Sequence, residues 1–122
     1  MKLLVTIHFS RERDRDEFQE REIEHINPAF ISRVETEDSP EEGALPAVHL
    51  AIGSPAAARE IGQLIQSFLR QGKRPPLLVR WPTSEQENQE VEIRADHPAE
   101  TETMVLRLIA ALKSMEDEKS TA

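Results

Sequence analysis

The residues best suited to bind a metal ion are four histidines, at positions 8, 25, 49 and 97. No two of them have the i, i+4 spacing that places two imidazoles on one helical face, and the chain contains no cysteine to supply a thiolate. We therefore expect no metal site, no disulfide and no cysteine nucleophile. His8 and His49 are expected at the edges of strands or helices, with their hydrogen bonds satisfied.

Acid–base catalysis is the second chemistry to consider, because carboxylates recur from Asp14 to Glu24 within one expected helix. A catalytic carboxylate needs a desolvated pocket that shifts its pKa. This segment carries charged residues all round the helix, which is typical of a solvated surface. We expect these carboxylates to face water rather than a substrate.

The dipeptide Gly53-Ser54 could belong to a nucleophile or to an anion site. Pro55 and Ala56 follow it, so the Gly-x-Ser-x-Gly pattern of a nucleophile elbow is absent. A serine before a proline is instead typical of a helix start, with Ser54 as N-cap and Pro55 in the first turn. Free N–H groups at such a start can bind a phosphate or a carboxylate, so Gly53 and Ser54 remain candidate anion-binding residues. With no Walker lysine or Gly-x-Gly-x-x-Gly motif, we expect no cofactor and no nucleotide hydrolysis.

A local separation of charge suggests a surface for a protein partner. Basic residues precede an acidic stretch, and together they give these candidate partner-binding residues: Arg70, Lys73, Arg74, Arg80, Glu85 and Glu87. The structural alternative is that the first two cations merely stabilise the C-terminal end of a helix.

Composition limits the class of protein. The chain has 122 residues, enough for about one domain, and its net charge of -8 argues against general binding to a phosphate backbone. Four phenylalanines, one tryptophan and no tyrosine leave few side chains for stacking on nucleic-acid bases. No apolar run approaches the roughly 18 residues of a membrane span, and no signal peptide is recognisable. We expect a cytoplasmic protein that binds neither nucleic acid nor membrane.

Hydrophobic periodicity predicts the elements that position these residues. Strands are expected at 2–9, 29–37, 77–81 and 89–95, and helices at 10–25, 54–71 and 98–114. Residues 46–52 fit either a short strand or a helical segment, and we favour the helical one. The prediction is a single α+β domain over residues 1–114, in the order β-α-β-α-β-β-α, with a frayed tail over 115–122.

These elements are expected to form a four-stranded mixed sheet with the helices packed on it. The early strand–helix–strand crossovers should be parallel, and the last two strands should form a hairpin. One buried cluster is expected to contain Ile61, Leu64, Ile65, Phe68, Leu77, Val79, Val105, Leu108 and Leu112.

Several segments together resemble the effector-associated constant component family. They are Leu50-Ala51-Ile52-Gly53-Ser54, the helix end Phe68-Leu69-Arg70, the strands Pro75-Pro76-Leu77-Leu78-Val79-Arg80 and Glu90-Val91-Glu92-Ile93, and the leucine-rich last helix. The resemblance covers nearly the whole chain and is strongest from Ala47 to Leu112.

That resemblance implies a small α+β adaptor of prokaryotic conflict systems, which serve antiviral defence. Members are encoded or fused beside effectors such as trypsin-like or caspase-like proteases, or beside NTP-dependent regulators, and have no catalytic residues of their own. We therefore expect a non-enzymatic component that couples a protein effector to its regulator. The alternatives are a small-ligand sensor with an anion at Gly53-Ser54 and, last, a small hydrolase or isomerase.

Overall fold

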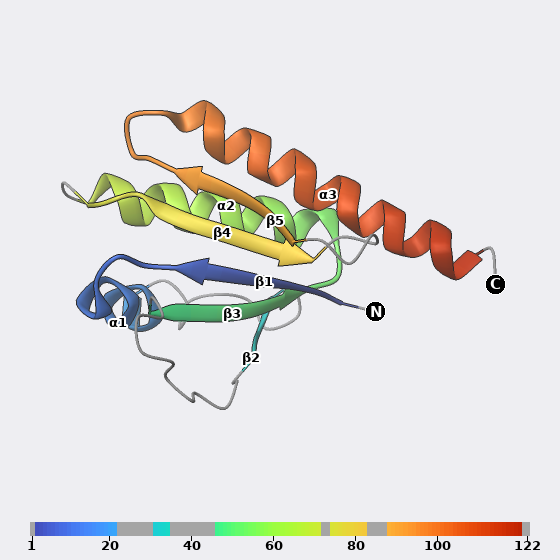
Figure 1. Cartoon of the computed structure of the whole chain (residues 1–122), viewed down its shortest axis with the longest axis horizontal. Helices are drawn as coiled ribbons and strands as arrows, with labels where there is room; N and C mark the ends of the chain where they lie inside the picture. Colours follow the sequence, from blue (N-terminus) through green and yellow to red (C-terminus); the bar gives the residue numbers. More distant parts are fainter. Residues whose placement is uncertain (1, 22–30, 35–45, 72–73, 83–87, 121–122) are drawn as a thin grey trace.

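The computed structural model describes residues 2–21, 31–34, 46–71, 74–82 and 88–120, without the side chains of 33, 34 and 116–120. Five strands and three helices occur in these segments (Figure 1). In chain order they are β1 (Leu3–His8), α1 (Glu12–Arg21), β2 (Ile31–Val34), β3 (Ala47–Ile52), α2 (Pro55–Arg70), β4 (Leu77–Pro82), β5 (Asn88–Ile93) and α3 (Pro98–Ser120). No helix in the described segments is both long enough and apolar enough to span a membrane.

The strands form one antiparallel sheet in the order β2-β3-β1-β4-β5. The central strand β1 pairs with β3, from Leu3 opposite Ile52 to His8 opposite Ala47, and with β4 on its other side. Helix α1 joins β1 to β2, and β3 lies between these two strands in the sheet. Helix α2 joins β3 to β4, and β1 lies between them. Each intervening strand is antiparallel to both of its neighbours. This is the split β-α-β arrangement of ferredoxin-like folds, extended here by β5 and α3.

The α+β class is confirmed, but the predicted four-stranded mixed sheet is wrong. Residues 47–52 form strand β3 instead of a helical segment. Val48, Leu50 and Ile52 of β3 are buried while the alternate residues are half-buried, which is the two-residue period of a strand. Because β3 lies between β1 and β2, the strands expected to pair in parallel are separated by an antiparallel one.

Two other predictions concern the C-terminal part of the chain. The hairpin of β4 and β5 is confirmed, with Leu77 opposite Ile93 and Val79 opposite Val91. Helix α3 extends to Ser120, six residues past the expected end at Ser114. Fraying of 115–122 therefore stays a prediction.

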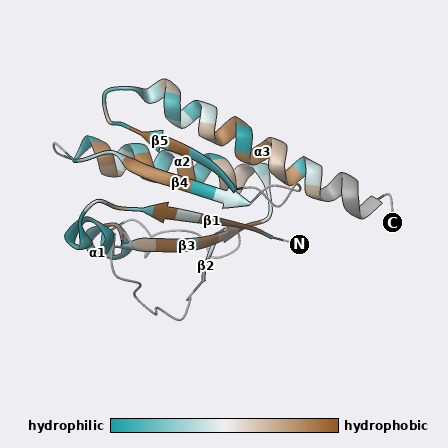
Figure 2. Ribbon diagram, in the orientation of Figure 1, coloured by the Kyte–Doolittle hydropathy of each residue, from teal (hydrophilic) through white to brown (hydrophobic). Residues whose placement is uncertain are grey.

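The hydrophobic core lies between the helices and one face of the sheet. Leu3, Val5 and Ile7 of β1 point into it, whereas Leu4 and the other alternate residues of β1 lie on the opposite face. The predicted cluster is confirmed: seven of its nine members are buried, and Leu64 and Val105 are partly buried against them. Figure 2 shows the contrast between hydrophobic β3 and hydrophilic α1, whose buried side chains are Asp14 and Phe18.

Helices α2 and α3 approach closely at Gly62. A Cβ atom added there would lie 2.6 Å from Val105 Cγ2, well inside van der Waals contact. Alanine is normally favoured over glycine in a helix by about 1 kcal/mol, but overpacking a tight contact costs about 1 to 3 kcal/mol. We expect Gly62→Ala to lower the free energy of unfolding by about 1 kcal/mol.

Urea unfolding of a double-mutant cycle tests this contact. In a Val105→Ala background the clashing methyl group is gone, so Gly62→Ala should become neutral or stabilising. An unchanged cost in both backgrounds would show that the helix contact is not its source.

Candidate functional site

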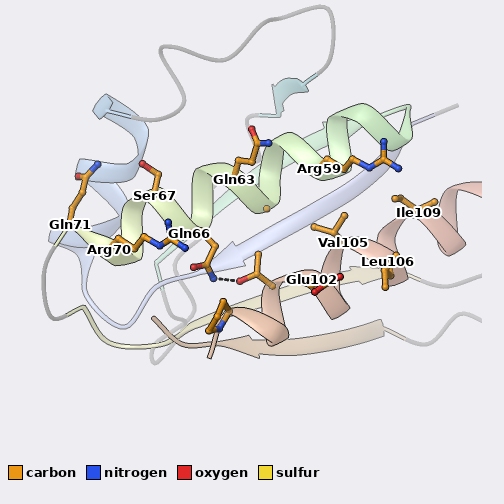
Figure 3. A pocket seen from close by; sticks show the side chains of 13 residues that line it. Arg59, Gln63, Gln66, Ser67, Arg70, Gln71, Glu102, Val105, Leu106 and Ile109 are labelled. Carbon is orange, nitrogen blue, oxygen red and sulfur yellow. Dashed lines mark hydrogen bonds between the residues drawn. The ribbon is translucent and has the colours of Figure 1, made fainter. Parts of the chain in front are cut away.

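A groove with a volume of about 870 Å³ lies between α2 and α3, on the side of these helices away from the sheet (Figure 3). Gln66 Nε2 of α2 donates a hydrogen bond to Thr101 Oγ1 of α3, and Gly62, one turn earlier in α2, lies against Val105, one turn later in α3. The two helices therefore run in opposite directions. Gln66 and Thr101 thus tie the helices together beside the groove. The groove is open to solvent rather than enclosed.

Helical periodicity explains which side chains line the groove. Arg59, Gln63, Gln66 and Arg70 recur at spacings of four, three and four, so they form one polar stripe along α2. The buried stripe of the same helix, which includes Ile65, faces the sheet. Helix α2 therefore holds the domain together with one face and presents amide and guanidinium groups with another.

The α3 side of the groove is mainly apolar. Val105 and Ile109 are partly buried there, and Leu106 has 62% of its surface exposed. In the described part of the chain, Leu106 is the most exposed large hydrophobic side chain, followed by Leu4 at 38% on the open face of the sheet. Fully burying one leucine contributes about 1.5 to 3 kcal/mol, so a partner that covers Leu106 would gain measurable affinity.

Two positive charges lie on the α2 side of the groove. Arg59 and Arg70 are exposed, and neither forms an ion pair within the described segments. By contrast, ion pairs engage Arg11, Arg13, Arg15, Arg74, Arg80 and Arg94. The apolar floor of the groove consists of Val105, Leu106 and Ile109. An apolar surface bordered by hydrogen-bond donors and arginines is typical of protein-binding sites.

The predicted partner-binding residues do not form one surface. Arg70 lines the groove, whereas Arg80 lies on the open face of the sheet, where it pairs with Glu90 across β4 and β5. The remaining predicted residues Lys73, Glu85 and Glu87 lie outside the described residues. Among the candidates that the structure describes, only Arg70 lines the groove.

The expectation that the charge of Arg74 is exposed is wrong, and its role in partner binding stays a prediction. Its side chain is only 10% exposed and donates to Asp14 Oδ1 at 3.1 Å, to Glu17 Oε2 at 2.8 Å and to the Phe68 carbonyl at 3.0 Å. The hydrogen bond from Arg74 lowers the pKa of Glu17 below its ordinary value. Asp14 is also buried, contrary to the expectation of a fully solvated carboxylate face, but Arg11 and Arg74 both pair with it. These contacts give Arg74 and Asp14 a structural role.

The predicted helix start at Ser54 is confirmed. Ser54 Oγ accepts a hydrogen bond from the backbone N–H of Ala57 at 3.2 Å, and Pro55 occupies the first turn. The hydroxyl oxygen of Ser54 therefore serves as the cap of the helix, and the neighbouring Gly53 is exposed. The anion site at Gly53 and Ser54 stays a prediction.

Two histidines lie on the open face of the sheet. Thr6 Oγ1 and His49 Nδ1 are 3.0 Å apart in a hydrogen bond, as expected, but His8 Nε2 is buried with no hydrogen-bond partner in the described segments. No group of three or more histidine, aspartate or glutamate side chains in those segments could hold a metal ion. His25 lies outside the described residues.

The environment of His8 predicts a pH dependence of stability. Burial lowers its pKa below the ordinary value of 6.5, and the positive charge of Arg80 lowers it further. The unfolded chain therefore takes up a proton at this histidine at a higher pH than the folded chain does. As pH falls from 7 through 6.5 and then through the lower folded pKa, the fold should lose stability.

The measurement is the free energy of unfolding between pH 7 and pH 5, for the wild type and for His8→Gln. Removing the titrating group should make the decline shallower in the variant. Parallel curves would show that other groups cause the pH dependence.

No family model, curated protein or solved structure matches this chain. The groove itself is therefore the feature from which a function can be inferred. Most of its lining residues were not predicted from the sequence. One feature of the sequence could have indicated the groove. The apolar residues of α3, such as Leu106 and Leu108, form a stripe wider than a helix needs in order to pack one face on a sheet.

Proposed function

We propose that this protein is a non-enzymatic accessory component that binds a partner protein in the groove between α2 and α3. The observation that carries this proposal is the exposed Leu106, which lines the same groove as Arg59 and Arg70, two arginines that have no ion pair within the described segments. An apolar anchor surrounded by polar groups is the usual form of an energetic hot spot in protein interfaces.

The resemblance of residues 47–112 to the effector-associated constant component family supports the choice of partner. On that basis the partner is a protease-like effector or its regulator in a prokaryotic conflict system, and the complex forms in the cytoplasm. A chain without cysteine is compatible with that reducing compartment. The protein would then act by holding its partner, with the chemistry performed by the effector.

The test is binding of the protein encoded by the neighbouring gene, measured by isothermal titration calorimetry. Leu106→Glu places a charge on the apolar floor, so it should weaken binding at least tenfold, because a partner would have to bury that carboxylate. The matched control is Leu4→Glu, which introduces the same change at the other exposed leucine of the described segments, on the open sheet face.

Both variants should unfold at nearly the wild-type temperature, since neither leucine is buried. Loss of binding with Leu4→Glu alone would move the interface to the sheet. Unchanged binding with Leu106→Glu would contradict the proposal.

A further inference from the structure

We infer that the groove between α2 and α3 receives an acidic amphipathic helix of the partner, an inference that rests on the proposed function and specifies its ligand. Three features of the groove lead to it: the sign of its free charges, the distance between them and the position of its apolar floor.

The sign of the charges favours an acidic ligand. The whole chain carries 15 basic and 23 acidic residues, yet the α2 edge of the groove presents Arg59 and Arg70, which lack acidic partners within the described segments. Glu102 lies on the opposite helix, between the levels of the two arginines. A ligand with carboxylates at its two ends and none in the middle would satisfy both arginines and avoid Glu102.

The spacing of the charges favours a helix. Arg59 and Arg70 lie at opposite ends of the groove in Figure 3, 11 residues apart on one straight helix. At about 1.5 Å per residue this separation is roughly 16 Å, or about three helical turns. Eleven residues also bring a helix back to almost the same face, at about 100° per residue. Two acidic residues 11 positions apart on a ligand helix would therefore face both arginines along one edge.

The apolar floor favours the same ligand. Val105, Leu106 and Ile109 lie along α3, which places hydrophobic contacts on the side of the groove opposite the arginines. A helix lying between α2 and α3 would direct apolar residues at i, i+4 and i+7 toward α3 and its acidic residues toward α2. The groove is open to solvent, so a ligand helix can approach it from outside the domain.

The probe is a fluorescein-labelled, alanine-rich peptide of sixteen residues. It carries leucine at its fifth, ninth and twelfth positions and glutamate at its second and thirteenth, which is the pattern derived above. A control peptide has lysine in place of both glutamates. Fluorescence anisotropy against the full chain should show binding of the glutamate peptide and at least tenfold weaker binding of the lysine peptide.

Charge reversal in the protein provides the specific test. Arg59→Glu together with Arg70→Glu should weaken the glutamate peptide at least tenfold and should strengthen the lysine peptide by a similar factor. The matched control combines Arg21→Glu and Arg107→Glu, which change the net charge equally at exposed arginines outside the groove. The control protein should keep the wild-type preference for the glutamate peptide.

Equal binding of the two peptides, or no binding of either at about 1 mM protein, would overturn the acidic-helix inference. A dimer in sedimentation velocity that Leu106→Glu dissociates would also overturn it, by assigning the groove to a second copy of the chain.

Titration of the neighbouring-gene protein separates this inference from the proposed function. If Leu106→Glu abolishes that interaction while reversal of Arg59 and Arg70 leaves it intact, the groove binds the partner but not through an acidic helix. If neither change affects it, the proposed function itself fails.

Discussion

Replacing Arg74 by alanine is expected to lower the free energy of unfolding by about 3 to 5 kcal/mol, the usual effect of breaking a buried ion pair. Asp14 has only 1% of its side chain exposed, and in the variant Arg11 alone would balance its charge. The guanidinium of Arg74 also lies 3.9 Å from the centre of the Phe68 ring, so the substitution removes a cation–π contact as well. Urea unfolding followed by fluorescence of the buried Trp81 measures the loss.

The matched control is Arg94→Ala. Arg94 also pairs with a carboxylate, that of Glu92 at 2.9 Å, but both side chains are about half exposed. Exposed pairs contribute under about 1 kcal/mol, so this variant should resemble the wild type. Equal effects of the two substitutions would show that the burial of the Arg74 pair has no energetic importance.

Phe68→Ala is expected to cost about 3 to 5 kcal/mol, the usual loss for a buried phenylalanine. The Phe68 ring is fully buried, and its centroid lies 6.0 Å from that of Phe9 and 5.3 Å from that of Phe18, with both pairs edge to face. These three rings connect the segment directly after β1 with α1 and α2. The substitution would therefore leave a cavity where α1 attaches to the rest of the domain.

A double-mutant cycle of Phe68→Ala with Phe18→Ala isolates the ring contact, which should contribute about 0.5 to 1.5 kcal/mol beyond the separate losses. Leu106→Ala is the control for a large apolar residue at an exposed position and should cost less than about 1 kcal/mol. A small effect of Phe68→Ala would contradict the placement of this ring in the core.

Local patterns in the sequence were sufficient to predict several elements. The Ser54-Pro55 start of α2 follows from the hydrogen-bonding needs of the first helical turn, and the apolar spacing from Ile61 to Phe68 follows from 3.6 residues per turn. The hairpin of β4 and β5 was predictable because its strands are neighbours in the chain. Each of these features depends on residues close together in the sequence.

Residues 47–52 show where local information was insufficient. Six residues in which valine, leucine and isoleucine alternate with alanine and histidine can form a strand or a short helix. Pairing with β1, whose residues lie 39 to 49 positions earlier in the chain, provides the hydrogen-bond partners that make the segment a strand. The insertion of β3 beside β1 also determined the strand order, so one uncertain segment changed the predicted sheet from mixed to antiparallel.

The candidate site depended even more on tertiary structure. Arg74 follows a helix, where a cation is ordinarily exposed, and only folding brings Asp14 to it from 60 residues away. Arg59 and Leu106 likewise belong to different helices, and the close approach of α2 and α3 at Gly62 places both beside one groove. Local sequence patterns are enough to place charged and apolar residues on most of the helices and strands. Which charges are neutralised inside the fold, and which lack an ion pair in the described segments at the groove, depends on tertiary packing, because the distances involved are between residues far apart in the chain.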